Sequence, residues 1–279
     1  MPELAEVETV RRGLAKKITS KTITAVTVLH PRPVRRHSAG IQDFEKTLVG
    51  RTFAEPKRRG KFMWFPFADG DALIAHLGMS GQFRVFDDGV EPHSKHTRVV
   101  FSLDSGESLE FVDTRMFGGL WLSPGGAERP PEIEHIAADP FSADYSQEEL
   151  AKQIAGSGRA IKRLLLDQGV VSGIGNIYAD ESLWRAEEHY LTTGVEMGVT
   201  RASRLLDAVK AVLSEAIAAG GTSFDALYVN ADGEPGYFER SLDVYGREGQ
   251  PCHRCGTQIV REPFMGRSSF LCPRCQVRE

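Results

Sequence analysis

The chain of 279 residues lacks the features of membrane, secreted and fibrous proteins. No run of roughly eighteen apolar residues occurs, so the sequence predicts no membrane span. The N-terminus lacks the basic-then-apolar pattern of a signal peptide, so we expect a cytoplasmic protein. Internal repeats and low-complexity tracts are absent as well. Hydrophobic content of 41% and charged content of 26% are ordinary for a globular chain with a sizeable core.

An excess of positive charge is also missing, because the formal net charge is −4. This total argues weakly against a nucleic-acid-binding protein, but a total hides how charge is distributed. Acids gather between Glu128 and Glu149, whereas bases gather at residues 32–36, 57–61 and 159–163 and again near the C-terminus. The composition is therefore compatible with a basic groove, although each cluster alone is typical of a solvated face.

Cysteine is absent from the first 251 residues, and all four cysteines lie near the C-terminus. In a cytosolic chain this distribution indicates a metal site and argues against a disulfide framework. Cys252-x-x-Cys255 and Cys272-x-x-Cys275 are separated by sixteen residues, a spacing typical of a four-cysteine zinc site. Four thiolates leave no open coordination position, so we expect one structural Zn²⁺, with a hairpin between the two pairs.

Two kinds of pattern divide the chain. Residues 3–18 predict a helix, because apolar side chains recur on one face at steps of three and four. Short β-rich runs follow from 22 to about 122, interrupted by one short helix near 42–48, and they indicate a sandwich or a barrel. From about 146 the pattern becomes helical, and the last long helix is expected over 200–219.

The predicted fold class is therefore α+β with two domains: a β-sandwich flanked by helices, then a helical domain that ends in a zinc finger. Residues 123–141 are rich in proline, glycine and glutamate and predict a linker. The predicted segments are 1–122 for the sandwich, 123–141 for the linker, 142–250 for the helical domain and 251–279 for the zinc finger.

The first residues hold a pair with chemical potential, Pro2 followed by Glu3. After loss of Met1, Pro2 would carry a free secondary amine that is partly unprotonated at neutral pH. Such an amine can attack an electrophilic carbon. Taken alone, the pair also fits a plain helix start, because proline suits the first helical position and acids suit the first turn.

Three further motifs each have two interpretations. The turn at residues 173–176, Gly-Ile-Gly-Asn, can expose backbone N–H groups to a phosphate or can be a plain helix–helix turn. Two Gly-flanked loops carry Met79 and, in the second loop, Arg115 with Phe117. These side chains could fill the space left by a base extruded from a duplex, or they could be core residues.

Together, and in this order, the motifs resemble those of the formamidopyrimidine-DNA glycosylases in the wider Fpg/Nei family. The similarity covers essentially the whole chain. It is carried by Pro2-Glu3-Leu4, His76-Leu77-Gly78-Met79-Ser80-Gly81, Arg115-x-Phe117-Gly118, Gly173-x-Gly175-Asn176-Ile177-Tyr178 and the four cysteines. The resemblance implies a bifunctional DNA glycosylase and AP lyase of base-excision repair with a helix–two-turn–helix domain. It also implies a monomer that acts on damaged double-stranded DNA and is nucleoid-associated when bound.

The resemblance assigns chemical roles to matching positions. Pro2 would attack C1′ of the damaged nucleotide to form an iminium, and Glu3 would protonate the opening sugar ring. Lys61 would contact phosphate, donate a proton during elimination and disfavour the protonated Pro2 amine. Arg267 would clamp a phosphate and donate a proton during δ-elimination. Glu6 would support the active-site end of the first helix.

Other positions match DNA contacts of the family, namely His76, Met79, Arg115, Phe117, Lys162 and Asn176. His76 and Lys162 would face phosphates and the lesion pocket, and Asn176 would clamp the backbone with the zinc finger. Met79, Arg115 and Phe117 would occupy the vacated stack, with Arg115 facing the orphaned cytosine. Glu181 falls where a residue of the lesion pocket would lie.

Two positions depart from the family pattern: Ala5 replaces a second proline, and Met116 replaces an arginine. Alanine favours the helix, but its start, and with it the aim of Pro2, could shift.

The Pro-Glu-Leu start and the segment 221–238, which resembles a loop that closes over 8-oxoguanine, favour oxidised purines as substrates. We therefore expect 8-oxoguanine opposite cytosine and formamidopyrimidines. Two alternatives stay open: an endonuclease VIII-like enzyme for oxidised pyrimidines, and a non-catalytic zinc-dependent nucleic-acid-binding protein. The last would have no need of Pro2, Glu3 and Lys61.

Overall fold

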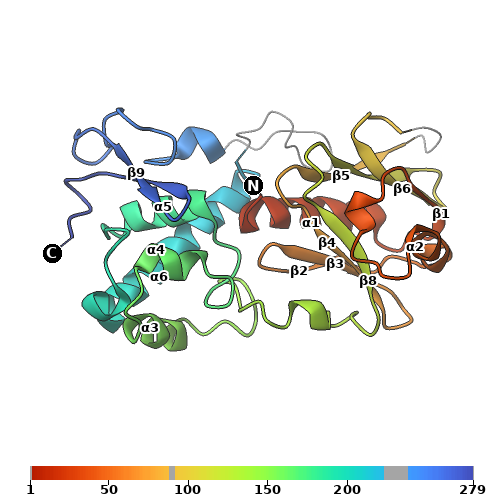
Figure 1. The fold of residues 1–279 in the computed structure, drawn as a ribbon, viewed down its shortest axis with the longest axis horizontal. Helices are drawn as coiled ribbons and strands as arrows, with labels where there is room; N and C mark the ends of the chain where they lie inside the picture. The colour runs from red at the N-terminus through yellow and green to blue at the C-terminus, as the bar shows by residue number, and fades with distance from the viewer. Residues whose placement is uncertain (1, 88–91, 223–237, 279) are drawn as a thin grey trace. The chain divides into compact units, whose positions relative to one another are not determined.

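The structure, a computed structural model, describes residues 2–87, 92–222 and 238–278 (Figure 1). These residues fall into two compact units. The first holds residues 2–135, apart from 88–91, together with 220–222, and the second holds 136–219 with 238–278. In the described ranges no helix is both long and apolar enough to span a bilayer. Met1 and most of the predicted loop over the lesion, residues 223–237, lie outside the described residues.

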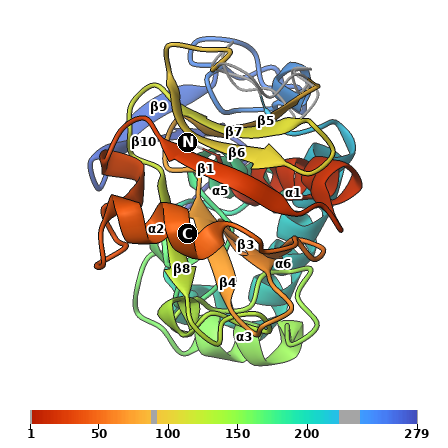
Figure 2. The same cartoon turned by 90° about the vertical axis from the view of Figure 1, so that its right-hand side faces the viewer.

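The first unit is built on two four-stranded antiparallel sheets, which Figure 2 shows one above the other. Their orders are β1-β6-β7-β5 and β2-β3-β4-β8. The strands are β1 (Ile23–Val28), β2 (Lys57–Arg59), β3 (Phe62–Pro66), β4 (Ala72–His76), β5 (Gly81–Phe86), β6 (Thr97–Leu103), β7 (Ser108–Asp113) and β8 (Gly119–Ser123). The two sheets confirm the predicted sandwich, and β2 and β8 are strands that the sequence patterns did not indicate.

The chain crosses from one sheet to the other three times, first from β1 to β2 and then at two neighbouring places. One crossing joins β4 to β5 and the other joins β7 to β8. His76 pairs with Gly119, and Gly81 pairs with Asp113. The connections 77–80 and 114–118 therefore begin and end on adjacent strands, so they run beside each other at one edge of the sandwich.

Helix α1 (Leu4–Ile18) packs against β2, β3 and β5 and confirms the predicted N-terminal helix. Its apolar face, from Val7 to Ile18, joins the core of the sandwich, as does Phe44 of α2 (Ile41–Leu48). Ala5 is fully buried in the first turn, and the helix begins at Leu4. Alanine at this position is therefore compatible with the expected start of the helix.

Glu8 ties α1 to the hairpin formed by β2 and β3. Its carboxylate accepts hydrogen bonds from Arg11 Nε at 3.0 Å, Arg12 Nε at 2.7 Å and Arg58 Nε at 3.0 Å. Arg58 lies in β2 and also donates from Nη1 to the Gly60 carbonyl at 3.0 Å. Burial alone would raise the pKa of Glu8, but the hydrogen bonds from Arg11 and Arg58 outweigh it and lower the pKa to about 2.

The second unit is helical, with α3 (Gln147–Ala155), α4 (Ile161–Leu166), α5 (Asn176–Arg185) and α6 (Gly194–Ala218), and it ends in the antiparallel hairpin of β9 (Val260–Phe264) and β10 (Arg267–Leu271). Helix α6 begins earlier than the predicted residue 200. Its first turn precedes Gly198, which has φ +67° and ψ 173° and interrupts the helix there. A residue with a β-carbon rarely adopts this conformation, whereas glycine does so freely.

Short 3-10 turns complete the description: η1 (Arg32–Val34), η2 (Pro131–Ile133) and η3 (Phe238–Ser241). The turn η2 lies in the predicted linker, where Ile133 is fully buried. Part of the linker is thus packed, and the domain boundaries at 122 and 142 stay predictions.

The Glu8 cluster leads to a prediction about stability. The folded-state pKa of Glu8, about 2, lies below its ordinary value of 4.5, so the cluster stabilises the fold above pH 4.5. This contribution is lost as the pH falls from 4.5 towards 2. We expect Glu8→Gln to lower the free energy of unfolding at pH 7 by about 3 kcal/mol, measured by urea denaturation.

The deficit of the Glu8 variant should shrink as unfolding is repeated at successively lower pH. Glu148→Gln is the matched control, because Glu148 forms an exposed pair with Lys152, and it should leave stability unchanged. Equal stability of wild type and Glu8→Gln at pH 7 would contradict the role of the cluster.

Candidate active site and metal centre

Pro2 and Glu3 lie at the N-terminal end of α1, and both are buried. The backbone N–H of Glu3 donates to Glu6 Oε2 at 2.8 Å as part of a capping box. The other oxygen of Glu6 accepts from the backbone N–H of Thr222 at 2.8 Å and from its hydroxyl at 3.0 Å. A β-carbon on Gly221 would come within 2.9 Å of Glu6 Oε1. Glu6 thus joins the start of α1 to residues 220–222, an arrangement suited to its predicted supporting role.

Lys61 lies in the two-residue turn that joins β2 to β3, directly after Gly60, which has φ +57°. Its side chain is largely buried, with 8% of the residue exposed. The hydrogen bond from Arg58 to the Gly60 carbonyl holds this turn, so the Glu8 cluster also fixes the backbone that carries Lys61.

His76 ends β4 and packs against Phe62, with ring centroids 4.7 Å apart. Burial, together with the positive charges of Arg36, Lys61 and Arg35, lowers the pKa of His76 to about 4. His76 is therefore neutral at pH 7. Its Nδ1 accepts from the Gly78 N–H at 3.2 Å, so Nε2 carries the proton and can donate to an anion.

The two crossing loops present the predicted base-replacing side chains. Met79, in the loop 77–80, is 40% exposed. In the loop 114–118, Phe117 is 51% exposed and Arg115 is also exposed. Both large apolar side chains are therefore open to solvent, on loops that run beside each other. The structure brings the two motifs together through the pairing of β4 with β8 and β5 with β7.

Asp113 is hydrogen-bonded to both loops and so connects them. It is fully buried, and its carboxylate accepts from the Ser80 hydroxyl at 2.5 Å and from the Gly118 N–H at 2.8 Å. The Ser80 hydroxyl in turn accepts from the Arg115 N–H at 2.9 Å. The sequence patterns predicted no role for Asp113 or Ser80, although Ser80 lies within the motif 76–81 and Asp113 lies two residues before Arg115.

In the second unit, the Gly-x-Gly-Asn turn leads directly into α5, whose first residue is Asn176. Gln168 fixes this turn: its side chain accepts from the Gly173 N–H at 2.9 Å and donates to the Ile174 carbonyl at 3.0 Å. Asn176 Nδ2 donates to the Ser268 carbonyl at 2.9 Å, next to Arg267 in the hairpin. The two residues predicted to clamp phosphate therefore lie close together.

Arg267 is exposed and is the first residue of β10. The hairpin turn before it consists of Met265 and Gly266, with φ values of 48° and 73°. Two positive φ values give the backbone twist that suits a tight two-residue hairpin. The predicted hairpin between the cysteine pairs is present, and it projects Arg267 into solvent.

The side chain of Lys162, a predicted DNA contact, is completely buried. Its ammonium group pairs with Asp180 at 2.6 Å and donates to the Ser268 carbonyl at 2.9 Å and the Ser269 hydroxyl at 2.8 Å. Burial raises the pKa of Asp180 to about 7, and the charge of Lys162 opposes this rise. We therefore propose a structural role for Lys162, joining the zinc-finger hairpin to α5, in place of the predicted DNA contact.

Glu181 is also buried, and its carboxylate accepts three backbone N–H groups. The donors are Asp243 at 2.8 Å, Val244 at 2.9 Å and Tyr245 at 2.8 Å. Burial raises the pKa of Glu181, against the effect of these hydrogen bonds. Glu181 thus fixes the backbone at 243–245, and its placement in a lesion pocket stays a prediction.

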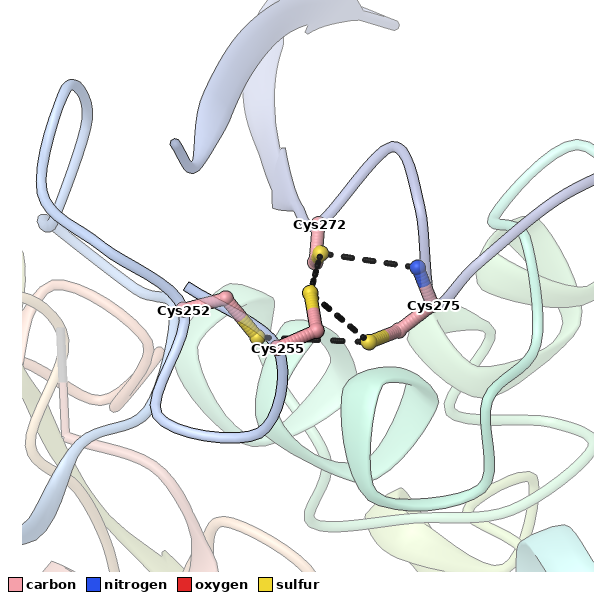
Figure 3. A group of neighbouring side chains, drawn as sticks. All are labelled: Cys252, Cys255, Cys272 and Cys275. Atoms are coloured by element: carbon pink, nitrogen blue, oxygen red, sulfur yellow. Dashed lines mark hydrogen bonds between the residues drawn. The ribbon is translucent and has the colours of Figure 1, made fainter. Parts of the chain in front are cut away.

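The four cysteines converge on one point, as Figure 3 shows. Their sulfur atoms all lie within 4.8 Å of one another, with separations of 3.5 Å for Cys255–Cys272, 3.5 Å for Cys255–Cys275 and 4.0 Å for Cys252–Cys275. Tetrahedral zinc with four thiolates requires sulfur atoms about 3.8 Å apart. The residues present therefore fit one structural zinc ion, as predicted.

Hydrogen-bond donors surround the sulfur atoms. Trp184 Nε1 of α5 donates to Cys252 at 3.4 Å, and the Cys275 N–H donates to Cys272 at 3.4 Å. Hydrogen bonds from Thr257 lower the pKa of the Cys255 thiol to about 6. Such donors stabilise thiolates and orient metal ligands. The contact with Trp184 also joins the zinc finger to the helical part of the same unit.

Family models match three parts of the chain. They are the formamidopyrimidine-DNA glycosylase N-terminal domain over residues 1–120, the formamidopyrimidine-DNA glycosylase H2TH domain over 136–227, and the zinc finger found in FPG and IleRS over 249–277.

Relatives match over the full length. The formamidopyrimidine-DNA glycosylase of Salinispora arenicola is 54% identical, over 100% of this chain and 97% of its own. That of Acidothermus cellulolyticus is 53% identical, over 99% of this chain and 97% of its own. A solved structure of the Lactococcus lactis Fpg with DNA containing an abasic site has a TM-score of 0.87 at 32% identity, over 99% of this chain and 100% of the other.

The fold, the clustered cysteines and these matches define a DNA glycosylase of the base-excision-repair type with a structural zinc site. More narrowly, the chain belongs to the formamidopyrimidine-DNA glycosylase family.

The zinc centre can be tested by removing the metal. We expect the purified protein to contain one zinc ion per chain, and a strong chelator should abolish the β9–β10 hairpin and lower the melting temperature. Metal analysis and near-ultraviolet circular dichroism with thermal melting give the readouts. A chelator already saturated with zinc is the control. Unchanged melting after complete loss of metal would contradict a structural role.

Proposed function

We propose that this protein is a bifunctional DNA glycosylase and AP lyase that excises oxidised bases from duplex DNA through its N-terminal proline. The observation that carries the proposal is the placement of Pro2 and Glu3, buried at the start of α1 with the Glu3 backbone held by Glu6. A protein that only bound DNA would have no use for this arrangement. Membership of a glycosylase family over the full chain adds independent support.

In the proposed mechanism, the Pro2 nitrogen attacks C1′ of the damaged nucleotide, and the base departs. Glu3 donates a proton to the ring oxygen as the sugar opens, which leaves a cationic iminium on Pro2. The iminium withdraws electrons and allows elimination of the 3′ and then the 5′ phosphate. Lys61 and Arg267 contact phosphates and supply protons during these eliminations.

The proposed recognition of DNA uses two sets of residues. Asn176 and Arg267 clamp the backbone of the lesion strand, helped by neutral His76, which donates from Nε2. Met79, Arg115 and Phe117 enter the stack where the damaged base was, and their exposure supports this role. The zinc ion holds the hairpin that carries Arg267 and takes no part in the chemistry.

We propose oxidised purines as the preferred substrates, with 8-oxoguanine opposite cytosine and formamidopyrimidines first. The Lactococcus lactis relative has been crystallised with DNA containing Fapy-dG, which supports this choice. It has also been crystallised with DNA containing an oxidised pyrimidine, so the pyrimidine-directed alternative deserves a direct comparison. We further propose a cytoplasmic protein that associates with the nucleoid when bound to DNA.

Covalent trapping tests the catalytic proposal. Protein lacking Met1 is incubated with duplex DNA containing 8-oxoguanine opposite cytosine, and borohydride is added to reduce the iminium. We expect a covalent adduct on a denaturing gel, and none from protein that carries an uncleaved N-terminal tag, in which the Pro2 nitrogen is an amide. Parallel duplexes with an oxidised pyrimidine rank the substrates. No adduct with any lesion would contradict the covalent mechanism, and equal trapping by the tagged protein would place the nucleophile elsewhere.

Salt dependence tests the phosphate clamp. Each phosphate contact contributes about −0.9 to the slope of log K against log salt, so Arg267→Ala should reduce the magnitude of the slope by about 1. Lys210→Ala, which removes one exposed charge from α6, is the control and should leave the slope unchanged. Fluorescence anisotropy over a salt series gives both values. An unchanged slope for Arg267→Ala would remove Arg267 from the interface.

A further inference from the structure

Three consecutive carbonyl groups of the loop 114–118 accept hydrogen bonds from two arginines, Arg32 at the start of the turn η1 and Arg35 directly after it. Arg32 Nε donates to the Met116 carbonyl at 3.0 Å. Arg35 donates to the Gly118 carbonyl at 2.8 Å and to the Phe117 carbonyl at 3.5 Å. Arg35 also donates to the Arg32 carbonyl at 2.6 Å, which closes the turn on itself.

These bonds occupy carbonyl groups of the loop, whereas Ser80 and Asp113 bind its N–H groups. The Arg115 N–H donates to the Ser80 hydroxyl, which donates to Asp113, and the Gly118 N–H donates to Asp113 directly. With both its carbonyl and its N–H groups hydrogen-bonded, the backbone of the loop has little freedom to move. The side chains of Arg115 and Phe117 remain exposed, so the fixed backbone sets where they point.

The conformation of this loop needs support. Met116 has φ 55°, in the left-handed region that residues with a β-carbon rarely adopt. A β-carbon on Gly78, in the neighbouring loop, would lie 2.5 Å from the Gly118 N atom, so the two loops touch backbone to backbone. The bond from Arg32 to the Met116 carbonyl fixes the strained residue itself.

Arg35 is used in this way in spite of an electrostatic cost. Desolvation and the charges of Arg36 and Arg32 lower the pKa of Arg35, which means that its positive charge is held in an unfavourable place. Hydrogen bonds from a guanidinium to carbonyl groups offset such a cost. Arg36 behaves differently, because its guanidinium lies over the Trp121 ring, 4.6 Å from the centroid.

We propose that Arg32 and Arg35 are positioning residues for the base-replacing wedge. They hold the backbone of residues 116–118 in one conformation. Because the loop is already ordered, Phe117 and Arg115 can enter the DNA stack with no prior rearrangement of the backbone. Within the basic cluster at 32–36, these two arginines thus support the wedge through its backbone. This inference rests on the proposed glycosylase function.

The experiment compares Arg35→Ala with Arg36→Ala, which removes the same charge one residue away and leaves the loop bonds intact. Single-turnover excision of 8-oxoguanine opposite cytosine requires the base to be expelled, whereas borohydride trapping on a preformed abasic site does not. We expect Arg35→Ala to slow excision at least about tenfold and to change abasic-site trapping less than about twofold. Arg36→Ala should change both rates less than about twofold, and Arg35→Lys should recover part of the loss.

The outcomes separate this inference from the function on which it rests. Equal slowing of excision by the Ala variants at 35 and 36 would overturn the positioning role and point to loss of charge. Equal slowing of excision and abasic-site trapping by Arg35→Ala would also overturn it, because general damage to the fold affects both. A wild-type protein inactive on both substrates would overturn the proposed function and this inference with it. Thermal melting of each variant confirms that it is folded.

Discussion

A carboxylate removed from water must be surrounded by hydrogen-bond donors, and this constraint shapes each functional segment of the protein. Glu6 receives N–H groups from the start of α1 and from Thr222. Asp113 receives donors from both crossing loops. Glu181 receives three successive backbone N–H groups near the zinc finger. In each case the acid connects segments that are distant in sequence, so satisfying its oxygen atoms also fixes the geometry of a candidate site.

The first unit shows how one sandwich supports two different tasks. Helix α1 contributes apolar residues to the core and at the same time presents Pro2 and Glu3 at its buried end. The opposite requirement applies to the crossing loops, which keep Met79 and Phe117 in solvent although both are large and apolar. A rigid backbone reconciles the two tasks, because an ordered loop loses less conformational entropy in the proposed insertion of its side chains into DNA.

In the second unit, the zinc finger depends on the helices as much as on the metal. Trp184 binds a cysteine sulfur, and the buried pair of Lys162 and Asp180 meets the hairpin next to Arg267. The hairpin is thus fixed at its base by metal ligands and along its length by α5. Its exposed tip, which carries Arg267, can contact a phosphate.

The sequence by itself determined the class of fold, the zinc ligands and the position of the N-terminal helix. Periodicity predicted α1 to within a residue, and cysteine spacing predicted a site whose sulfur atoms indeed converge, because both signals are local in the chain. Only the tertiary structure decided what Lys162, Ser80, Asp113, Arg32 and Arg35 contact. Lys162 was predicted to contact DNA. The sequence could not reveal its burial, because the hairpin that contacts it lies about a hundred residues further along the chain. The arginines looked like a surface charge cluster because their partners are backbone carbonyls, which no side-chain pattern in a sequence can reveal.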